Sequence, residues 1–241
     1  MEIIKTENLT KLYNGNPAVD GVSITVNEGE IYGFVGRNGA GKTTVIRMLA
    51  GLAKKSSGSF SLFGIPDNNP AITAARRNMR VMVETATLHT GLTAVQNMTI
   101  QCKLLGQDTK CIQKLLYDVE LDRTGKKPVK NFSLGMKQRL AIAMAMVGEP
   151  KLLILDEPTN GLDPEGIFKV RELLVKLNRE MGVTILVSSH ILTELSKFAT
   201  CYGFIERGRL IKELTAEELA AEGDLEEYFL NLIGGRHYEA R

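Results

Sequence analysis

The sequence predicts an α/β fold with a mostly parallel sheet, and three patterns point to it. Residues 152–155 (LLIL) and 183–187 (VTILV) are short, continuously apolar runs, typical of strands buried on both faces of a parallel sheet. Residues 164–180, between them, have the spacing of a helix, which gives a β–α–β crossover. Shorter β-rich runs at the start of the chain predict an antiparallel β layer, and a mainly helical stretch over residues 92–147 predicts a helical subdomain insertion.

The first part of the chain alternates predicted strands and turns. Residues 3–9, 22–26 (VSITV) and 31–35 (IYGFV) are β-rich, and turn residues separate them at 14–17 (NGNP) and 27–29 (NEG). The remaining predicted elements, in chain order, are a helix over 42–52, strands over 59–63 and 81–83, helices over 95–105, 112–119 and 140–147, the strand–helix–strand unit described above, a hairpin of 202–206 and 209–212, and an amphipathic helical tail over 215–233.

Length and composition exclude several classes of protein. The chain has 241 residues, of which 44% are hydrophobic and 24% are charged, as in an ordinary globular protein rather than a disordered one. Its formal net charge is only +2, which argues against a nucleic-acid binder. The three cysteines are odd in number and lack metal-ligand spacing, which favours a reducing compartment.

Two further features concern the membrane. The longest uncharged apolar run, residues 140–148, is far shorter than the ~18 residues needed to cross a bilayer. The opening residues (MEIIKTENLT) lack the basic and apolar regions of a secretion signal. We therefore expect a soluble protein, which can still dock onto a membrane partner.

A glycine-rich loop carries the most specific motif. Residues 36–43 (GRNGAGKT) match the phosphate-binding pattern G-x-x-x-x-G-K-[ST], between a predicted strand and a predicted helix, which predicts a P-loop NTPase core. Glycines let the backbone N–H groups turn toward phosphate oxygens, and the helix N-terminus adds partial positive charge. Lys42 is expected to reach the β- and γ-phosphates, and the Thr43 hydroxyl to ligate Mg²⁺. A chance match in a glycine-rich turn is the alternative, which the flanking strand and helix disfavour.

Two carboxylates follow the predicted strand at residues 152–155. They emerge at its carboxyl end, where ligands bind in open α/β sheets. We expect Asp156 to hold Mg²⁺ through water, and Glu157 to polarise an attacking water. Two solvated acids at a strand end are the alternative, which is the weaker interpretation once the pair is combined with the Lys42 loop.

Together these motifs resemble those of the ATP-binding subunits of ABC transporters, and the resemblance covers nearly the whole chain. Residues 131–139 (NFSLGMKQR) are similar to the signature loop of this family, usually LSGGQ-Q-R. Ser133 and Gly135 are kept, whereas Leu134 and Met136 replace a glycine and a glutamine. The resemblance implies that Ser133 and Gly135 contact the γ-phosphate held by a second subunit. A plain helix cap is the alternative role for Ser133, and the two roles are compatible.

The resemblance also implies a nucleotide site built from residues spread over the chain. Tyr13 resembles the aromatic residue that stacks on adenine, although taken alone it is an ordinary strand-end tyrosine. Asp163, in the segment NGLD, lies in the loop that communicates across the dimer. His190 resembles the histidine that contacts the γ-phosphate and positions the attacking water. The catalytic residues implied are Glu157, His190 and Lys42, and the metal ligands are Thr43, Glu84 and Asp156. The nucleotide-binding residues implied are Tyr13, Gly36, Asn38, Gly39, Ala40, Gly41, Lys42, Thr43, Thr44, Glu84, Ser133, Gly135 and Asp163.

Glu84 departs from the family pattern, which has a glutamine at the junction between the core and the helical lobe. A carboxylate there can still ligate Mg²⁺, but it brings negative charge close to the γ-phosphate. The variant resembles a subgroup of bacterial exporters that protect against peptide antibiotics, of the lantibiotic-immunity and bacitracin-resistance type. The segment from Glu84 to Val95 is then expected to contact a coupling helix of the membrane subunit.

These inferences predict a single ATPase domain over residues 1–241. The ATP-binding core is expected to comprise residues 1–83 and 149–212, the helical subdomain residues 84–148, and the helical tail residues 213–241.

The function implied by the resemblance is that of a motor subunit that powers export. ATP and Mg²⁺ are the expected cofactors, and this chain with a second copy of itself or a homologous cassette is expected to enclose two Mg²⁺-ATP molecules. The other expected partner is a membrane permease subunit, with no nucleic acid, which places the chain at the cytoplasmic face of the cell membrane.

Two alternatives stay open at this point. The first is a non-transport ATPase of the same superfamily, in DNA repair or translation. Lys42 and Ser133 lie too close in the sequence for the long coiled-coil arm of repair members, and translation members usually carry two cassettes on one chain. The second is a nucleotide-gated clamp with weak hydrolysis, which Glu84 and the altered signature would permit.

Overall fold

The computed structural model describes residues 1–83, 88–222, 228–229 and 231–232. Glu84 therefore lies outside the described residues, as does much of the predicted tail. The strands are β1 (Glu2–Tyr13), β2 (Asn16–Val22), β3 (Thr25–Asn27), β4 (Ile31–Val35), β5 (Ser57–Leu62), β6 (Ile65–Pro66), β7 (Met79–Met82), β8 (Leu152–Asp156), β9 (Thr184–Ser189), β10 (Cys201–Glu206) and β11 (Arg209–Thr215). The helices are α1 (Lys42–Ala50), α2 (Ile72–Ala75), α3 (Ala94–Leu104), α4 (Ile112–Asp118), α5 (Leu134–Ala145), α6 (Pro164–Met181), α7 (Leu192–Leu195) and α8 (Ala216–Glu222), with short 3₁₀ turns at Arg76–Asn78, Thr109–Cys111, Asp122–Thr124 and Val129–Asn131.

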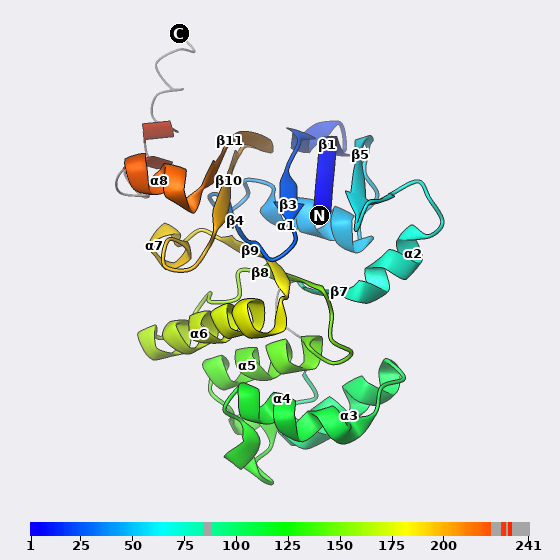
Figure 1. Ribbon diagram of the computed structural model, residues 1–241, viewed down its shortest axis with the longest axis vertical. Helices are drawn as coiled ribbons and strands as arrows, with labels where there is room; N and C mark the ends of the chain where they lie inside the picture. Colours follow the sequence, from blue (N-terminus) through cyan, green and yellow to red (C-terminus); the bar gives the residue numbers. More distant parts are fainter. Residues whose placement is uncertain (84–87, 223–227, 230, 233–241) are drawn as a thin grey trace.

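The strands of the described residues form two sheets (Figure 1). One is antiparallel, in the order β2-β1-β5-β6, with β3 also paired to β1. The other has the order β11-β10-β4-β9-β8-β7 and is parallel except for β11 at its edge. Ser188 of β9 is in register with Phe34 of β4 and with Asp156 of β8. The carboxyl ends of these three strands therefore meet at one edge, the usual place for a ligand in a parallel sheet.

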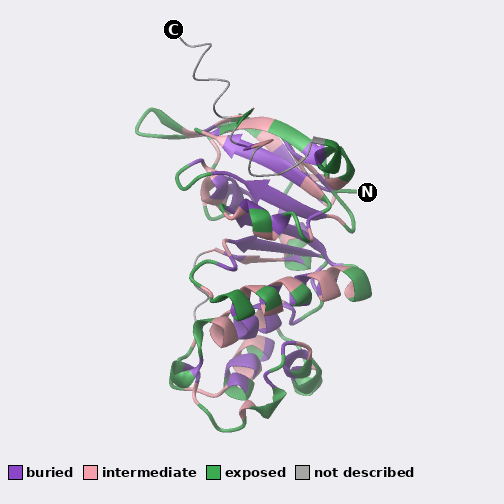
Figure 2. Cartoon of the chain, turned by 90° about the vertical axis from the view of Figure 1, so that its left-hand side faces the viewer, coloured by how far each residue is buried: buried purple, intermediate pink, exposed green. Residues whose placement is uncertain are grey.

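Alternate side chains of the parallel strands enter two different hydrophobic cores. Tyr32 and Phe34 of β4 join the core that lies against the antiparallel sheet and α1. Ile31 and Val35 join the core on the other face, where α6 and the helices α3, α4 and α5 pack. Since successive side chains of a strand point to opposite faces, a continuously apolar strand is buried on both sides. Figure 2 shows strands in the middle of the molecule coloured as buried.

The helices α3, α4 and α5 gather at the end of the molecule opposite the antiparallel sheet, and we call them the helical lobe. α6 lies between this lobe and the parallel sheet, and it contacts both α5 and β9 (Figure 1). Met98, Leu116 and Ile142, one from each helix of the lobe, belong to the same hydrophobic core as α6. The lobe is thus tied to the rest of the molecule chiefly through α5 and α6.

The predicted α/β fold, with its antiparallel layer and helical insertion, is confirmed, but the prediction of one strand over residues 22–26 is wrong. β2 ends at Val22, and β3 begins only at Thr25. At the break, the Thr6 hydroxyl donates to the Val22 carbonyl at 2.9 Å and accepts from the Ile24 N–H at 2.9 Å. Hydrogen bonds to the Thr6 side chain thus take the place of strand hydrogen bonds at this point. Strand propensity alone does not predict such a break.

The predicted four-residue turn at 14–17 is also too long. Asn14 and Gly15 adopt left-handed φ angles of 51° and 83°, so they form a two-residue hairpin turn by themselves. Asn16 and Pro17 therefore already belong to β2, paired with Tyr13 and Leu12. The domain boundaries predicted from the sequence stay a prediction.

The described part of the tail includes α8 and Phe229, whose ring stacks on Phe204 at 5.8 Å between centroids. No helix within the described ranges has the length and hydropathy required to cross a bilayer.

Candidate nucleotide-binding site

The glycine-rich loop connects β4 to α1 and borders a small cavity of about 170 Å³. Gly41 precedes α1 with φ 110°, and no side chain caps this helix start. The first N–H groups of a helix have no partner within the helix, so they are available to an anion. Described residues that line the cavity are Ala18, Arg37, Asn38, Gly39, Ala40, Gly41, Lys42, Thr43, Thr44 and Glu157.

Two glycines of this loop, Gly36 and Gly41, are required by close backbone approaches. A Cβ on Gly41 would lie 2.7 Å from the Ala18 carbonyl oxygen, and one on Gly36 would overlap the carbonyl of Ile205 in β10. The β10–β11 hairpin also supports the loop, because the Gly208 N–H donates to the Ala40 carbonyl at 2.9 Å. The loop is thus held between β2 and the β10–β11 hairpin.

Lys42 lies at the centre of the site, with a side chain only 5% exposed. Its ammonium donates to the carbonyl oxygens of Gly36, at 2.5 Å, and Arg37, at 3.2 Å. It also lies 3.1 Å from Oε1 of Glu157. This is a buried cation in the lining of the cavity, and a carboxylate is its charged neighbour.

Asp156 joins the loop to the parallel sheet. The Thr43 hydroxyl donates to its Oδ2 at 2.6 Å, and the Ser188 hydroxyl donates to its Oδ1 at 2.5 Å. Both oxygens of this 5% exposed carboxylate are therefore oriented by hydroxyl groups. The arrangement follows from the strand register, which places Asp156 beside Ser188.

Glu157 is held in a left-handed conformation, with φ 51°, directly after β8. Its N–H donates to the carbonyl of Ser188 at 3.2 Å and to the Ser188 hydroxyl at 3.0 Å. Oε2 lies 2.7 Å from Nδ1 of His190, whereas Oε1 is buried and has the Lys42 ammonium as its charged neighbour at 3.1 Å. The carboxylate thus lies between a lysine and a histidine, with one oxygen beside each.

Several residues predicted from the sequence lie away from this cavity. Tyr13, at the end of β1, is 47% exposed, does not line the cavity, and has the Lys11 ammonium 4.9 Å from its ring centre. Ser133 lies in the helical lobe, where its hydroxyl caps α5 by accepting from the Met136 N–H at 3.2 Å.

Gly135 and Asp163 lie where the helical lobe meets α6. A Cβ on Gly135 would be 3.6 Å from the Cα of Gly166, so the first turns of α5 and α6 approach closely. The Asp163 carboxylate caps α6 by accepting from the Gly166 N–H at 3.0 Å. These two residues form a second group, separate from the cavity around Lys42.

Sequence reasoning missed Ser188 and the tip of the β10–β11 hairpin. Ser188 ends the apolar run of β9, and a small hydroxyl residue at the carboxyl end of a buried strand is a signal that could have found it. No local signal identifies Gly208, because its contacts with Ala40 and Asp20 depend on how the two sheets pack.

The residues fit a Mg²⁺ ion that is held jointly with a nucleotide. Thr43 and Asp156 offer oxygen ligands, which Mg²⁺ prefers, and the ion usually keeps waters and phosphate oxygens as its other ligands. The described chain has no group of three or more His, Cys, Asp or Glu side chains that would hold a metal ion by themselves.

Comparison with known proteins agrees with this geometry. Residues 19–160 match the family described as ABC transporter. The bacitracin transport ATP-binding protein BcrA of Bacillus licheniformis is 47% identical over 220 residues, which cover 90% of this chain and 71% of that protein. The lantibiotic transport ATP-binding protein SrtF of Streptococcus pyogenes is 42% identical over 234 residues, which cover 96% of this chain and 97% of that protein.

Solved structures show the same fold. The cassette MJ0796, in a dimeric post-hydrolysis state with ADP and Pi, matches with a TM-score of 0.78 and 26% identity, over 88% of this chain and 98% of its own. A structure described as the ATP binding subunit of an ABC transporter matches with a TM-score of 0.83 and 28% identity, over 96% and 99%. This chain therefore belongs to the ABC transporter family, as one of its ATP-binding, ATP-hydrolysing proteins.

Proposed function

We propose that this ATPase powers the export of a peptide antibiotic of the bacitracin or lantibiotic class through a separate membrane subunit. The named relatives support the substrate class, since BcrA and SrtF are bacitracin and lantibiotic transport proteins. The position of Glu157 between Lys42 and His190 supports the hydrolytic role and is the observation that carries the proposal.

The phosphates of ATP bind to the loop from Gly36 to Thr44. The N–H groups at the start of α1 donate to the phosphate oxygens, and Lys42 neutralises the β- and γ-phosphates. Tyr13 stacks on adenine, and its exposed position at the end of β1 leaves one face of the ring accessible to a base.

Glu157 acts as the general base in hydrolysis. Its buried Oε1 accepts a proton from the water that attacks the γ-phosphate, while His190 holds Oε2 and thereby fixes the orientation of the carboxylate. Mg²⁺, held by Thr43, Asp156 and Glu84, would neutralise charge that develops on the phosphates. Ser188 orients Asp156 and the backbone of Glu157 together.

The site is completed by a second cassette. Ser133 and Gly135 do not line the cavity of their own chain, and they lie in the helical lobe at the start of α5. We assign them to the γ-phosphate of ATP bound by the facing subunit, where the Ser133 hydroxyl and the first N–H groups of α5 donate hydrogen bonds. Asp163 lies between the two half-sites at the start of α6.

The membrane partner binds through the segment from Glu84 to Val95. Of this segment the structure describes residues 88–95, which lead into α3, and Val95 is 39% exposed there. This contact places the chain at the cytoplasmic face of the membrane. Because Glu84 brings a negative charge to the same junction, Glu84→Gln is expected to keep nucleotide binding and to alter turnover.

Neither alternative function is favoured. The named relatives are transport proteins, which does not support a role in DNA repair or translation. A clamp with weak hydrolysis would not need a histidine 2.7 Å from the carboxylate of Glu157.

Phosphate release by the purified protein tests the hydrolytic role. Glu157→Gln should lower the rate about 100- to 10,000-fold, the range for loss of a general base, and should keep the affinity for ATP. Glu28→Gln, at a surface ion pair with the chain terminus, is the matched control and should keep the wild-type rate. Equal low rates in wild type and Glu157→Gln would instead support the clamp.

The transport role has its own test. The membrane subunit that co-purifies with this chain is identified, and the two are reconstituted together in vesicles. Bacitracin or a lantibiotic should stimulate ATP hydrolysis by the pair and should move in an ATP-dependent manner. Stimulation by neither peptide would contradict the proposed substrate class.

A further inference from the structure

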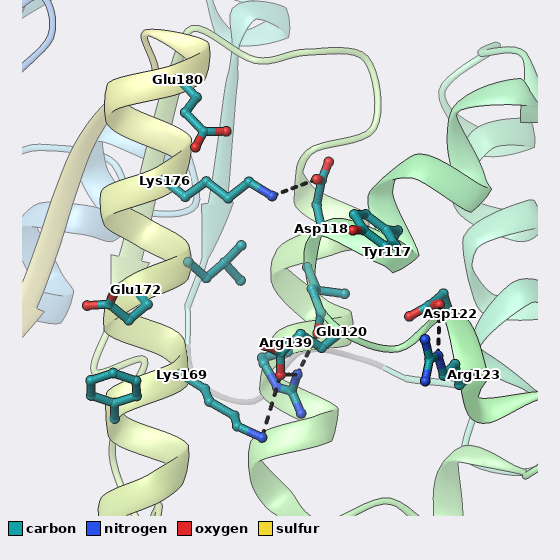
Figure 3. Close-up of a pocket in the computed structure, with 13 residues that line it drawn as sticks. Tyr117, Asp118, Glu120, Asp122, Arg123, Arg139, Lys169, Glu172, Lys176 and Glu180 are labelled. Carbon is teal, nitrogen blue, oxygen red and sulfur yellow. Dashed lines mark hydrogen bonds and ion pairs between the residues drawn. The ribbon is translucent and has the colours of Figure 1, made fainter.

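A cleft of about 790 Å³ separates α6 from the segment that follows α4 (Figure 3). Most of the charged side chains that line it already lie in ion pairs with one another. Lys176 of α6 lies 2.8 Å from Asp118, and Lys169 lies 3.5 Å from Glu120. Both ion pairs cross the cleft, from the core helix α6 to the helical lobe, and Figure 3 shows them at two levels along α6.

The two lysines are seven residues apart, so they lie on the same face of α6 and about 10 Å apart along its axis. Lys176 with Asp118 is the more shielded pair, because the Asp118 side chain is only 12% exposed. The hydrogen bond to Asp118 raises the pKa of Lys176 above its ordinary value.

Arg139 connects the segment that follows α4 to α5, the helix that Ser133 caps. Its guanidinium lies in α5, six residues after Ser133, and is largely buried. Nη1 donates to the Val119 carbonyl at 2.6 Å and to the Glu120 carboxylate at 3.1 Å. Arg139 thus joins residues 119 and 120 directly to α5.

One of the contacts between α5 and α6 is a close approach of glycines near their first turns. A Cβ on Gly135 would lie 3.6 Å from the Cα of Gly166, and one on Gly161 would lie 3.3 Å from the Leu134 side chain. With small residues at this point, the two helices touch at their first turns. The ion pairs bridge the open cleft farther along α6.

We propose that the residues of the pairs Lys176–Asp118 and Lys169–Glu120 are positioning residues. They set the angle of α5 about its contact with Gly166, and this angle determines the position in which Ser133 meets the facing subunit. The inference rests on the proposed role of Ser133 at the ATP of a second cassette. Lys176–Asp118 has the larger effect on the angle, because it lies farther from the glycine contact than Lys169 does.

The test measures the ATP concentration that gives half-maximal dimerisation in a Glu157→Gln background, which blocks hydrolysis. Lys176→Met and Asp118→Asn should raise this concentration on the order of threefold to tenfold, as expected for loss of one partly buried ion pair. Lys176→Arg, which keeps the charge, should stay within about twofold of the parent. Lys110→Met is the matched control, because among the described residues Lys110 forms an ion pair only with Asp108, two residues before it.

Two further measurements separate positioning from general damage. The affinity of the monomer for a fluorescent ATP analogue should remain at the parent value, since the Lys42 loop is not touched. Exchange of the charges, Lys176→Asp with Asp118→Lys, should restore dimerisation that either single reversal impairs.

The outcomes distinguish the two levels of the proposal. A Glu157→Gln parent that stays monomeric at saturating ATP overturns both the two-subunit site and this inference. A parent that dimerises, with Lys176→Met and Asp118→Asn unchanged, overturns only the inference. A loss of dimerisation in Lys176→Arg as large as the loss in Lys176→Met also overturns the inference, because Lys176→Arg keeps the positive charge.

Discussion

At the scale of single residues, Ser188 links the two carboxylates of the site. Its hydroxyl donates to Asp156, while its hydroxyl and carbonyl oxygens both accept from the Glu157 N–H. This explains why Glu157 tolerates a φ of 51°, which costs energy in a residue with a side chain. The sequence predicts the two acids from their place after a buried strand, but the hydroxyl that fixes both is identified only once the strands are in register.

Thr43 provides the residue-scale prediction for the metal. Thr43→Val removes the hydroxyl that lies 2.6 Å from Asp156, so the Mg²⁺ concentration for half-maximal ATP hydrolysis should rise on the order of tenfold or more. Thr43→Ser keeps the hydroxyl and should stay within about threefold of wild type. A Mg²⁺ titration of phosphate release distinguishes them, and identical curves for Val and wild type would exclude Thr43 as a ligand.

At the scale of elements, the phosphate-binding loop depends on structure far away in the sequence. The motif, the strand before it and the helix after it are all predicted correctly from residues 31–52, although α1 ends at Ala50. The contacts of Gly36 with Ile205 and of Ala40 with Gly208 come from the β10–β11 hairpin. Local sequence therefore predicts the shape of the loop, and only tertiary packing reveals what holds it.

Gly36→Ala tests that dependence. The added Cβ would overlap the backbone carbonyl of Ile205, which cannot rotate away as a side chain can, so the free energy of unfolding should fall by about 1–3 kcal/mol. Gly91→Ala is the control, because a Cβ there meets nothing within 4 Å and the backbone is not left-handed. Urea unfolding measures both, and an equal midpoint for Gly36→Ala and wild type would contradict the packing described.

At the scale of the whole molecule, the two sheets are joined by polar contacts as well as by a hydrophobic core. The Tyr32 hydroxyl donates to Glu213 Oε1 at 2.6 Å, within the parallel sheet, and the N–H of Thr25, in the antiparallel sheet, donates to the same oxygen at 3.5 Å. Arg209 of β11 also pairs with Asp20 of β2 at 2.6 Å. Such contacts between elements far apart in the chain are not predictable from hydrophobic periodicity.

Glu213 gives this junction a pH dependence. Burial raises the pKa of Glu213, so the folded protein keeps this proton to higher pH than the unfolded chain does. Stability from this group is complete below pH 4.5, the ordinary pKa of the side chain, and is lost as the pH rises through the folded-state pKa.

Wild type should therefore lose stability relative to Glu213→Gln as the pH rises from 4.5 toward neutrality. Urea unfolding of both proteins at a series of pH values measures the difference, with Glu28→Gln as an exposed control. Parallel curves for wild type and Glu213→Gln would show that this carboxyl does not titrate differently in the folded state.

The central claim at this scale is that the molecule carries two half-sites, one around Lys42 and one at Ser133. Because these half-sites lie apart in one chain, two chains must pair to enclose ATP, and the mass of the ATP-bound protein should double. Analytical ultracentrifugation of Glu157→Gln with Mg²⁺-ATP should give twice the 26.5 kDa of one chain. The added variant Ser133→Arg should bind ATP and yet sediment as a single chain. A Glu157→Gln protein that remains a single chain at saturating ATP, or a Ser133→Arg variant that still doubles its mass, would contradict the account.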